Sequence, residues 1–504
     1  MKTQKSFSGA ANAAPDRRTL RGQAFGGAAL GLALRGAAVG LAALGGAALG
    51  CAPDLSLSDP TGSGAGGEGG RAPQSGGEVQ WARALEGDGE QAGASVAVAD
   101  DRTAALLGRL TEAESVALDG KSVSPIGAEN VFWARLAAND GTGLDLKRFG
   151  AFDPQIVNAL ATDGNEGLLV AGEFSGTLEF GGEPRTSAGG RDGYIAHLDA
   201  EGRELWLQPL GGLGFQAATS VAASATGRIV VAGRFSGALV IGKDRLESAG
   251  GSDVFVASFD ADGTPLWSKR FGDGFDQQPR AVAMDERGNA VVVGDFAGTI
   301  DLGGEPLRSA GDLDVFVASL DALGEHRWSK RFGDAGLQRA RAVAIDGANN
   351  VIVGGEFAGT LDLGGGPRTA GEREAVFVAK LDPKGEHRYS RVIGEHGASL
   401  GQLLVDGTGD VLVVGGFRGE AALAGEPVTS AGEDDVFVAK LDPEGGYRWS
   451  HRFGGAGPDR ATGVAVDRDR QAFVTGAFTG DVQFGEKQLE GGEGTDVFVT
   501  KLSP

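Results

Sequence analysis

The segment Asp314–Gly333, DVFVASLDALGEHRWSKRFG, decides the fold because the chain repeats it at a nearly fixed interval. Its apolar start recurs as VFW, YIA or VFV, in steps of 60 to 63 residues. These starts are Val131, Tyr194, Val254, Val315, Val376, Val436 and Val497. A repeat of this length, built from short apolar runs and turn residues, is typical of propellers and solenoids, in which neighbouring units bury each other's faces.

A tryptophan marks the same unit and gives the same number of copies. The marked positions are Trp81, Asp145, Trp206, Trp267, Trp328, Tyr389 and Trp449. Two copies therefore depart from tryptophan, but the spacing continues through them. The sequence predicts seven units.

Four apolar strands can be read in each unit; in the fifth they are 340–346, 350–357, 376–382 and 387–393. Their apolar residues are consecutive, which predicts strands covered on both faces. Asp-led turns with glycine suit tight hairpins between the first and second strands and between the third and fourth. We expect the aspartates of the first turn to bond to the turn backbone, and residues 355–371 to form an extra hairpin. Those aspartates are Asp163, Asp285, Asp346, Asp406 and Asp467.

The segment 435–476, DVFVAKLDPEGGYRWSHRFGGAGPDRATGVAVDRDRQAFVTG, resembles the bacterial seven-bladed β-propeller repeat known as SBBP. The resemblance covers 78–502. By analogy with related propellers, the first strand of each unit is innermost and the tryptophan strand outermost. The chain would then enter with an outermost strand at 79–85 and end with a third strand at 497–502. We therefore expect the two ends of the propeller to complete one shared blade.

Composition supports an all-β protein and excludes some partners. The chain has 504 residues, of which 41% are hydrophobic and 89 are glycine, which favours short strands and turns over helices. A net charge of −22 argues against nucleic acid, whose phosphates need a basic surface. The single cysteine, Cys51, excludes an intramolecular disulfide and a cysteine-based metal site.

Residues 1–50 are predicted to be an export signal, since Arg17, Arg18 and Arg21 precede an apolar run from 24 to 50 with one charge. The run ends in Ala48-Leu49-Gly50-Cys51, which resembles a bacterial lipobox and predicts lipidation of Cys51. The alternatives are an ordinary cleaved signal and a twin-arginine signal. Residues 51–77 are a Gly/Ser-rich tether, and 78–504 are the propeller. These features predict a lipoprotein of the cell envelope, anchored at the outer membrane, with secretion as the alternative.

The links between blades and the extra hairpins should share one face, and we expect any binding site there. A polar position recurs before the innermost strands, either as a ligand ring or as a clip that satisfies neighbouring backbone groups. Its residues are Gln91, Gln155, Gln216, Gln277, Gln338, Ser399 and Asp459. Apolar link residues form a second candidate, either as a contact patch or packed under the hairpins. They are Phe152, Phe215, Phe275 and Leu337.

No catalytic constellation stands out. Gly397–Gly401 matches the nucleophile-elbow pattern but lies in a link between blades, and the five histidines form no repeated cluster, so no metal or cofactor is predicted. The sequence favours a non-catalytic binding scaffold for an unknown protein or glycan of the cell envelope. One alternative is a quinoprotein-like enzyme, because LDxxGxxxW resembles the tryptophan-docking motif of quinone-cofactor propellers. Another is an envelope-assembly lipoprotein resembling the propeller subunit of the β-barrel insertion machinery.

Overall fold

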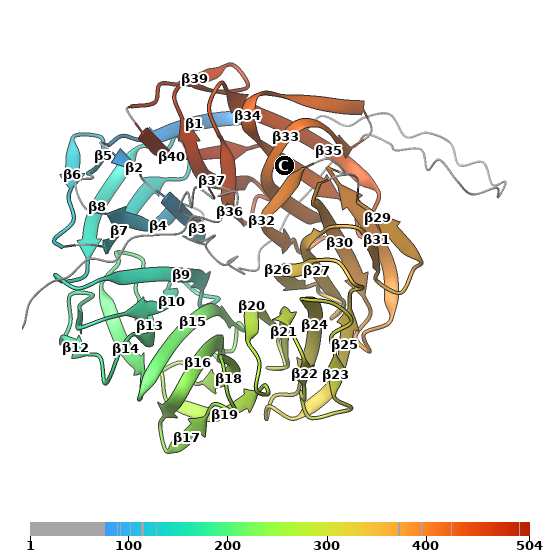
Figure 1. Ribbon diagram of the computed structural model, residues 1–504. Helices are drawn as coiled ribbons and strands as arrows, with labels where there is room; N and C mark the ends of the chain where they lie inside the picture. Colours follow the sequence, from blue (N-terminus) through green and yellow to red (C-terminus); the bar gives the residue numbers. More distant parts are fainter. Residues whose placement is uncertain are drawn as a thin grey trace, which may run out of the picture. The chain divides into compact units, whose positions relative to one another are not determined.

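Seven four-stranded antiparallel blades surround a central opening in the computed structural model (Figure 1). The structure describes residues 76–504 apart from 88, 91, 101, 112–114, 128, 371–372, 395–396, 425 and 493. The predicted export signal, the tether up to residue 75, Cys51 and Gln91 lie outside the described residues. No helix in the described part of the chain has the length and hydropathy of a membrane span.

Each blade runs from an innermost to an outermost strand, and we name the blades A to G in chain order. The innermost strands of A to G are β3 (Ala92–Asp100), β9 (Gln155–Thr162), β15 (Gly214–Ala223), β20 (Gln277–Met284), β26 (Gln338–Ile345), β32 (Ala398–Val405) and β36 (Arg460–Val466). The second strands are β4 (Thr103–Thr111), β10 (Leu168–Phe174), β16 (Ile229–Ile241), β21 (Ala290–Phe296), β27 (Val351–Phe357), β33 (Val411–Ala424) and β37 (Ala472–Thr479).

The outer half of each blade contains the segment that identified the repeat. The third strands are β7 (Glu129–Ala137), β13 (Asp192–Leu198), β18 (Asp253–Phe259), β24 (Asp314–Leu320), β30 (Ala375–Leu381), β34 (Glu426–Leu441) and β40 (Gly494–Leu502). The outermost strands are β8 (Gly143–Phe149), β14 (Glu204–Leu210), β19 (Pro265–Phe271), β25 (His326–Phe332), β31 (His387–Ile393), β35 (Tyr447–Gly455) and, in blade G, β1 (Val79–Leu85).

The predicted closure through the N-terminal strand is confirmed. Blade G has the order β1-β40-β37-β36, and β1 pairs antiparallel with β40 from Val79–Leu502 to Leu85–Val497. Residues more than 400 positions apart therefore complete one sheet. Joining the ends in one blade leaves the ring without an open blade boundary.

The predicted extra hairpins lie between the second and third strands. The hairpin strands are β5 (Val116–Leu118) with β6 (Lys121–Val123), β11 (Thr177–Leu178) with β12 (Arg185–Thr186), β22 (Thr299–Ile300) with β23 (Leu307–Arg308), β28 (Thr360–Asp362) with β29 (Pro367–Thr369), and β38 (Val482–Phe484) with β39 (Lys487–Leu489). In blade C the hairpin pairs β17 (Asp244–Glu247) with the extended β16, and in blade F it continues β33 and β34. A short strand, β2 (Gly89–Glu90), pairs parallel with β40.

The core is divided among the blade interfaces, as the consecutive apolar runs predict. All seven residues of β24 are buried. Val315 and Val317 of this strand pack in one cluster with Val353 and Phe377 of the next blade. Each third strand is thus covered on both faces, which explains why DVFV repeats without alternating with polar residues.

The tryptophans join each blade to the next. The indole N–H of Trp267 donates to the carbonyl of Ala322 (3.1 Å) in the following blade. Gly324 of the same turn has φ +79°, and a Cβ there would lie 2.8 Å from the Trp267 ring. The turn therefore needs glycine for both its backbone conformation and its packing. This contact explains the common repeat of Trp and Gly.

Two departures from this pattern are compensated by other residues. Asp145 replaces tryptophan in blade A, but Trp133 of β7 is buried there, and a Cβ on Gly202 would lie 2.9 Å from its ring. In blade G the chain ends interrupt the turn, and Gly77 takes the place of its glycine, with a Cβ position 3.1 Å from Trp449. The inter-blade packing is therefore continuous around the ring.

The two faces of the ring differ in their connections. The tight-turn face carries the Asp-led turns; in one of them Asp346 Oδ1 accepts hydrogen bonds from the N–H groups of Ala348 (2.9 Å) and Asn350 (2.8 Å), as predicted. The loop face carries the links between blades and the extra hairpins. Val79 and Ala472 both pair with Leu502, next to the turn that Asp467 leads. Both ends of the propeller therefore lie on the tight-turn face.

Candidate binding face

The repeated glutamines are buried inside the links of the loop face. Gln155, Gln216, Gln277 and Gln338 have no exposed surface. Gln338 Nε2 donates to Asp334 Oδ1 (2.8 Å), and its Oε1 accepts from the Asp334 N–H (3.2 Å); Gln277 forms the same pair with Asp273. These amides hold the shape of the links, which favours the structural interpretation over a ligand ring.

Ser399 does not occupy the position of these glutamines. Gln338 pairs with Phe357 across blade E, and in blade F the residue that pairs with the equivalent Phe417 is Ala398. The link into blade F is one residue shorter, so counting from Tyr389 places the prediction one residue too far. Ser399 corresponds to Arg339 instead, and its hydroxyl donates to the Gly416 carbonyl (3.4 Å).

Asp459 precedes the inner strand of blade G as a buried carboxylate. Its two oxygens accept from the N–H groups of Gly455 (2.6 Å) and Thr479 (3.3 Å), so it bonds to the link as the glutamines do. Burial, with the nearby charges of Asp435 and Asp434, raises the pKa of Asp459 to about 6. The link into blade G therefore carries an ionisable group at this position, unlike the links with glutamine.

The predicted apolar residues of the links separate into two pairs. Phe152 is 73% exposed and Phe275 is 59% exposed, as a contact patch requires. Phe215 is half-buried with the Arg234 guanidinium 5.0 Å from its ring centroid, and Leu337 is half-buried. Sequence reasoning missed Leu213, which is 69% exposed at the tip of the link between blades B and C. Its flanking glycines, Gly212 and Gly214, were the signal for a projecting tip.

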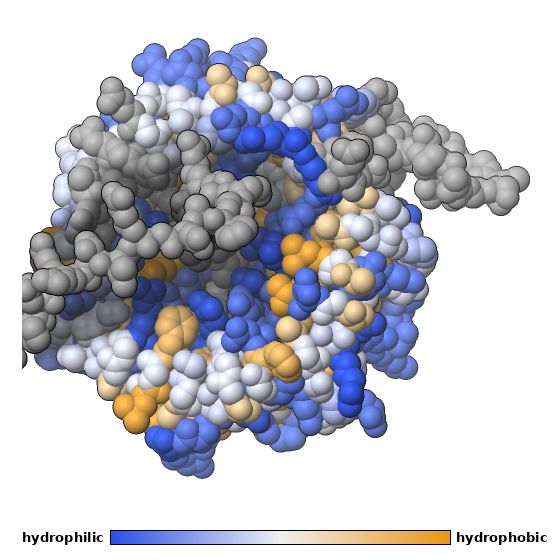
Figure 2. Space-filling view, viewed as in Figure 1, coloured by the Kyte–Doolittle hydropathy of each residue, from blue (hydrophilic) through white to orange (hydrophobic). Residues whose placement is uncertain are grey.

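Large exposed apolar side chains in the described residues gather on one part of the ring. They are Ile126, Leu144, Phe152, Leu205, Leu213, Val240, Leu266, Phe275 and Leu323. All except Leu323 lie between β6 and β20, in blades A to C and the links that follow each of these blades. Figure 2 shows that apolar patches around the opening are separated by hydrophilic side chains. The apolar contact surface is therefore a set of separate anchors.

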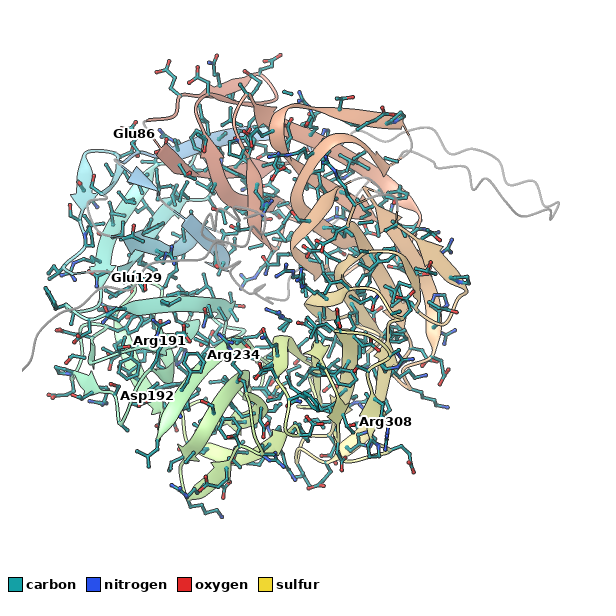
Figure 3. All side chains as sticks on the ribbon, viewed as in Figure 1. Glu86, Glu129, Arg191, Asp192, Arg234 and Arg308 are labelled. Atoms are coloured by element: carbon teal, nitrogen blue, oxygen red, sulfur yellow. The ribbon has the colours of Figure 1, made fainter. Side chains whose placement is uncertain are left out.

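Charged residues occupy one equivalent position on the second strands of blades A to E, near the loop face. Strand register aligns Arg109, Glu173, Arg234, Asp295 and Glu356. Four of these residues form ion pairs: Arg109–Glu129 (3.1 Å), Glu173–Arg191 (2.8 Å), Asp295–Arg280 (2.8 Å) and Glu356–Arg341 (2.9 Å). Burial raises the pKa of Asp295, against the lowering effect of Arg280. Figure 3 labels Glu129, Arg191 and Arg234 in successive blades.

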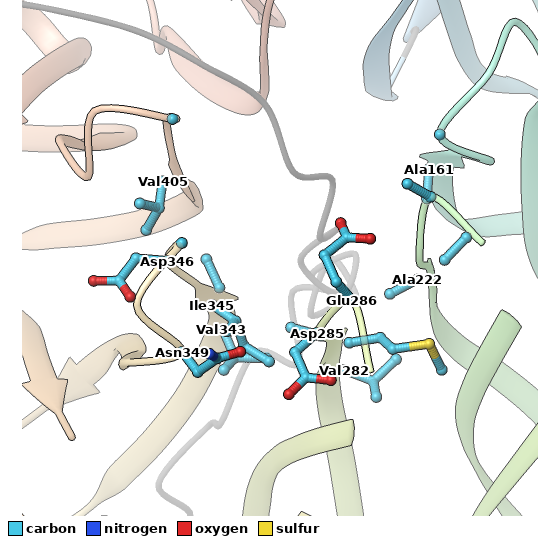
Figure 4. Close-up of a pocket in the computed structure, with 18 of the residues that line it drawn as sticks. Ala161, Ala222, Val282, Asp285, Glu286, Val343, Ile345, Asp346, Asn349 and Val405 are labelled. Carbon is cyan, nitrogen blue, oxygen red and sulfur yellow. The ribbon is translucent and has the colours of Figure 1, made fainter. Parts of the chain in front are cut away.

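A cavity of about 590 Å³ opens in the channel on the opposite, tight-turn side (Figure 4). The ends of the inner strands of blades B to F form its wall, with Val282, Val343 and Val405 among the apolar residues. Asp285 and Asp346 lie at its rim, where their carboxylates already bond to their own turns. We expected any site on the loop face, so this cavity was not predicted.

The described residues contain no group of three or more His, Cys, Asp or Glu side chains that could hold a metal ion. His197 Nε2 lies 3.0 Å from Asp163 Oδ2. This pair joins the third strand of blade B to its first turn. Buried Lys380–Asp346 (2.9 Å) and Lys501–Asp467 (3.2 Å) pairs occupy the equivalent place in blades E and G.

Comparisons with known proteins find partial matches at low sequence identity. No protein-family model matches the chain. The chain is 26% identical over 354 residues to the regulatory protein FlaEY of Caulobacter vibrioides, which covers 62% of this chain and 35% of that protein. The chain spans no more than 35% of the length of the curated relatives it matches.

Solved structures with a similar arrangement include enzymes and a propeller domain. One is the quinohemoprotein alcohol dehydrogenase of Comamonas testosteroni, with a TM-score of 0.41, 12% identity and coverage of 84% of this chain and 76% of that one. Another is the β-propeller domain of the Trilobed protease from Pyrococcus furiosus, with a TM-score of 0.39, 9% identity and coverage of 79% and 95%. The chain described here is an all-β, seven-bladed propeller.

Proposed function

We propose that this protein is a non-catalytic scaffold of the cell envelope that binds a partner protein through its loop face. The observation that carries the proposal is the exposure of Phe152, Leu213 and Phe275 in three consecutive links. Exposed aromatic and aliphatic side chains act as anchors when they fill pockets of a partner. A single exposed side chain would need no explanation, but three in successive links do.

The position of the chain ends supports the same face. Both ends of the propeller lie on the tight-turn face, so a lipid on Cys51 would attach on that side. The segment from 52 to 76 has 25 residues and can extend to about 85 Å at 3.3–3.6 Å per residue. A tether of this length would let an anchored propeller reach a partner with its loop face. Loop surfaces that face a partner are common sites of recognition on rigid scaffolds.

The non-catalytic part of the proposal rests on the roles of the repeated residues. The tryptophans that resemble a quinone-docking motif pack on turn glycines, such as Trp267 on Gly324, and the repeated aspartates bond to their own turns. A structural role thus explains each repeated position without a reaction. An absorbance spectrum after incubation with pyrroloquinoline quinone tests this part, because retention of the quinone through gel filtration would contradict it.

Binding is tested on the full chain, extracted from its native membrane in mild detergent and separated on a native gel. The wild-type chain should migrate in a complex larger than the monomer. Replacing Phe152, Leu213 and Phe275 with Ser should return it to the monomer position. Leu323→Ser is the matched control, because Leu323 is 68% exposed in a turn of the opposite face. A complex that survives the triple substitution would contradict the proposal.

A further inference from the structure

Arg234 differs from the charged residues that share its position in the neighbouring blades. Arg109, Glu173, Asp295 and Glu356 each have an oppositely charged partner within 3.1 Å. Within the described residues, the Arg234 guanidinium forms neither an ion pair nor a hydrogen bond; its carbon lies 5.0 Å from the centroid of the Phe215 ring. Blade C thus keeps the position charged without supplying the counter-charge.

Because Arg234 is half-buried, the lack of a counter-charge costs free energy, and a ligand with a negative charge would offset that cost. The side chain is half-buried, so its guanidinium has given up part of its hydration without gaining a carboxylate. The contact with the Phe215 ring is a cation–π contact, which uses none of the guanidinium N–H groups and leaves them for a planar acceptor. A carboxylate fits this edge with two parallel hydrogen bonds.

The residues near Arg234 indicate which groups flank the carboxylate in the ligand. Leu213, 69% exposed, precedes Phe215 by two residues, and Phe275, 59% exposed, lies in the next link. A polyanion such as nucleic acid is disfavoured, because the protein carries a net charge of −22. One basic group beside apolar anchors fits a single acidic side chain flanked by apolar ones, as in a peptide segment.

From this juxtaposition we propose that Arg234, with Phe215, Leu213 and Phe275, binds an acidic-apolar peptide segment of the partner protein through one of its carboxylates. The inference rests on the proposed function and specifies the chemistry of the partner. Arg234 fixes the position and identity of the acidic residue, and the apolar residues supply the anchoring contacts.

The test is a selection from a random peptide library displayed on phage against the immobilised full chain. Enriched peptides should share Asp or Glu next to Leu, Phe or another large apolar residue. Binding of the synthetic peptides, measured by fluorescence anisotropy, should weaken about tenfold or more with Arg234→Gln, the loss of about 1.4 kcal/mol or more. Replacing the acidic side chain of the peptide by its amide (Asp by Asn, Glu by Gln) should weaken binding to the wild-type protein by the same factor. The same change should have little effect on binding to the Arg234→Gln variant.

Two variants serve as controls. Arg287→Gln removes the same charge from an exposed arginine in the tight turn between β20 and β21, on the opposite face from the apolar anchors, and should change binding less than twofold. Arg234→Lys keeps the charge but loses the planar pair of donors, and should give an intermediate affinity if the glutamine variant is unstable.

The outcomes separate this inference from the proposed function. Enriched peptides without acidic residues, or peptides that bind Arg234→Gln as tightly as the wild type while Phe275→Ser weakens them, would overturn the role of Arg234 and leave the loop-face function standing. Peptides insensitive to both substitutions would overturn both proposals.

Discussion

Replacing Trp81 with Ala should destabilise the whole propeller, because this side chain closes the ring between blades G and A. Trp81 is 7% exposed and packs edge-on against Phe473 at 6.0 Å between ring centroids. Its indole N–H donates to the carbonyl of Ala138 (3.2 Å) in blade A, and a Cβ on Gly141 would lie 2.7 Å from its ring. The substitution therefore removes contacts on both sides of the closure.

The magnitude follows from these contacts. Truncating a buried Trp to Ala costs about 3–5 kcal/mol. Lys501 Nζ also donates to the Ala138 carbonyl (2.9 Å), so losing the indole N–H leaves no unsatisfied acceptor. We therefore expect the lower part of that range, about 3–4 kcal/mol, against a typical total stability of about 5–15 kcal/mol.

Equilibrium urea unfolding, followed by far-ultraviolet circular dichroism, measures this loss. Gln80→Ala is the control, because Gln80 is the exposed neighbour of Trp81 on β1 and should change the stability by less than about 0.5 kcal/mol. Equal unfolding midpoints for the two variants would refute the reasoning. Such a result would mean that β1 adds little to the stability of blade G.

Three further predictions concern other residues. Asp459→Asn should raise the free energy of unfolding by about 1–2 kcal/mol at pH 7.5. The pKa of Asp459 is about 6 in the folded protein against about 4 in the unfolded chain, which costs about 3 kcal/mol at this pH, and the loss of one hydrogen bond in the variant offsets about 1 kcal/mol of the gain. That cost grows as pH rises from about 4 through 6, so the gain should vanish at pH 4; an equal gain at both pH values in thermal melts would contradict the assignment. Gly324→Ala should lower the unfolding free energy by more than about 1 kcal/mol because of its φ of +79° and its contact with Trp267, whereas Gly347→Ala, with open space around its Cβ position, should not; similar losses for the two would contradict the turn-glycine role. Cys51→Ser should abolish incorporation of labelled acyl chains and release the protein from the membrane fraction; labelling or membrane retention equal to the wild type would show that Cys51 is not the anchor.

The fold could be predicted because its determinants repeat in the sequence. Consecutive apolar residues such as Val315–Val317 are buried in every blade, and most of the tight turns have Asp and Gly at fixed positions. The closure by 79–85 also followed, because the repeated region begins with an outermost strand and ends with a third one. Periodicity was sufficient for the strands and turns, and the analogy with related propellers gave the strand order on which the closure depends.

Features that depend on exceptions to the repeat could not be predicted in the same way. Trp133 replaces the missing tryptophan of blade A from a neighbouring strand, and a link shorter by one residue shifts Ser399 out of register with the glutamines. The charge at the position of Arg234 changes sign between blades, so no motif revealed the pairs around it. The half-burial of the link residue Leu337 depends on its packing in the fold, which sequence spacing does not encode.

Site-specific photocrosslinking in the native cell tests the central claim most directly. A benzophenone side chain is placed at position 152, 213 or 275 of the loop face, or at position 323 of the tight-turn face, and adducts are detected on denaturing gels. The account predicts that the three loop-face positions crosslink to the same partner protein and that position 323 does not. Adducts that form from position 323 alone, or at all four positions equally, would contradict it.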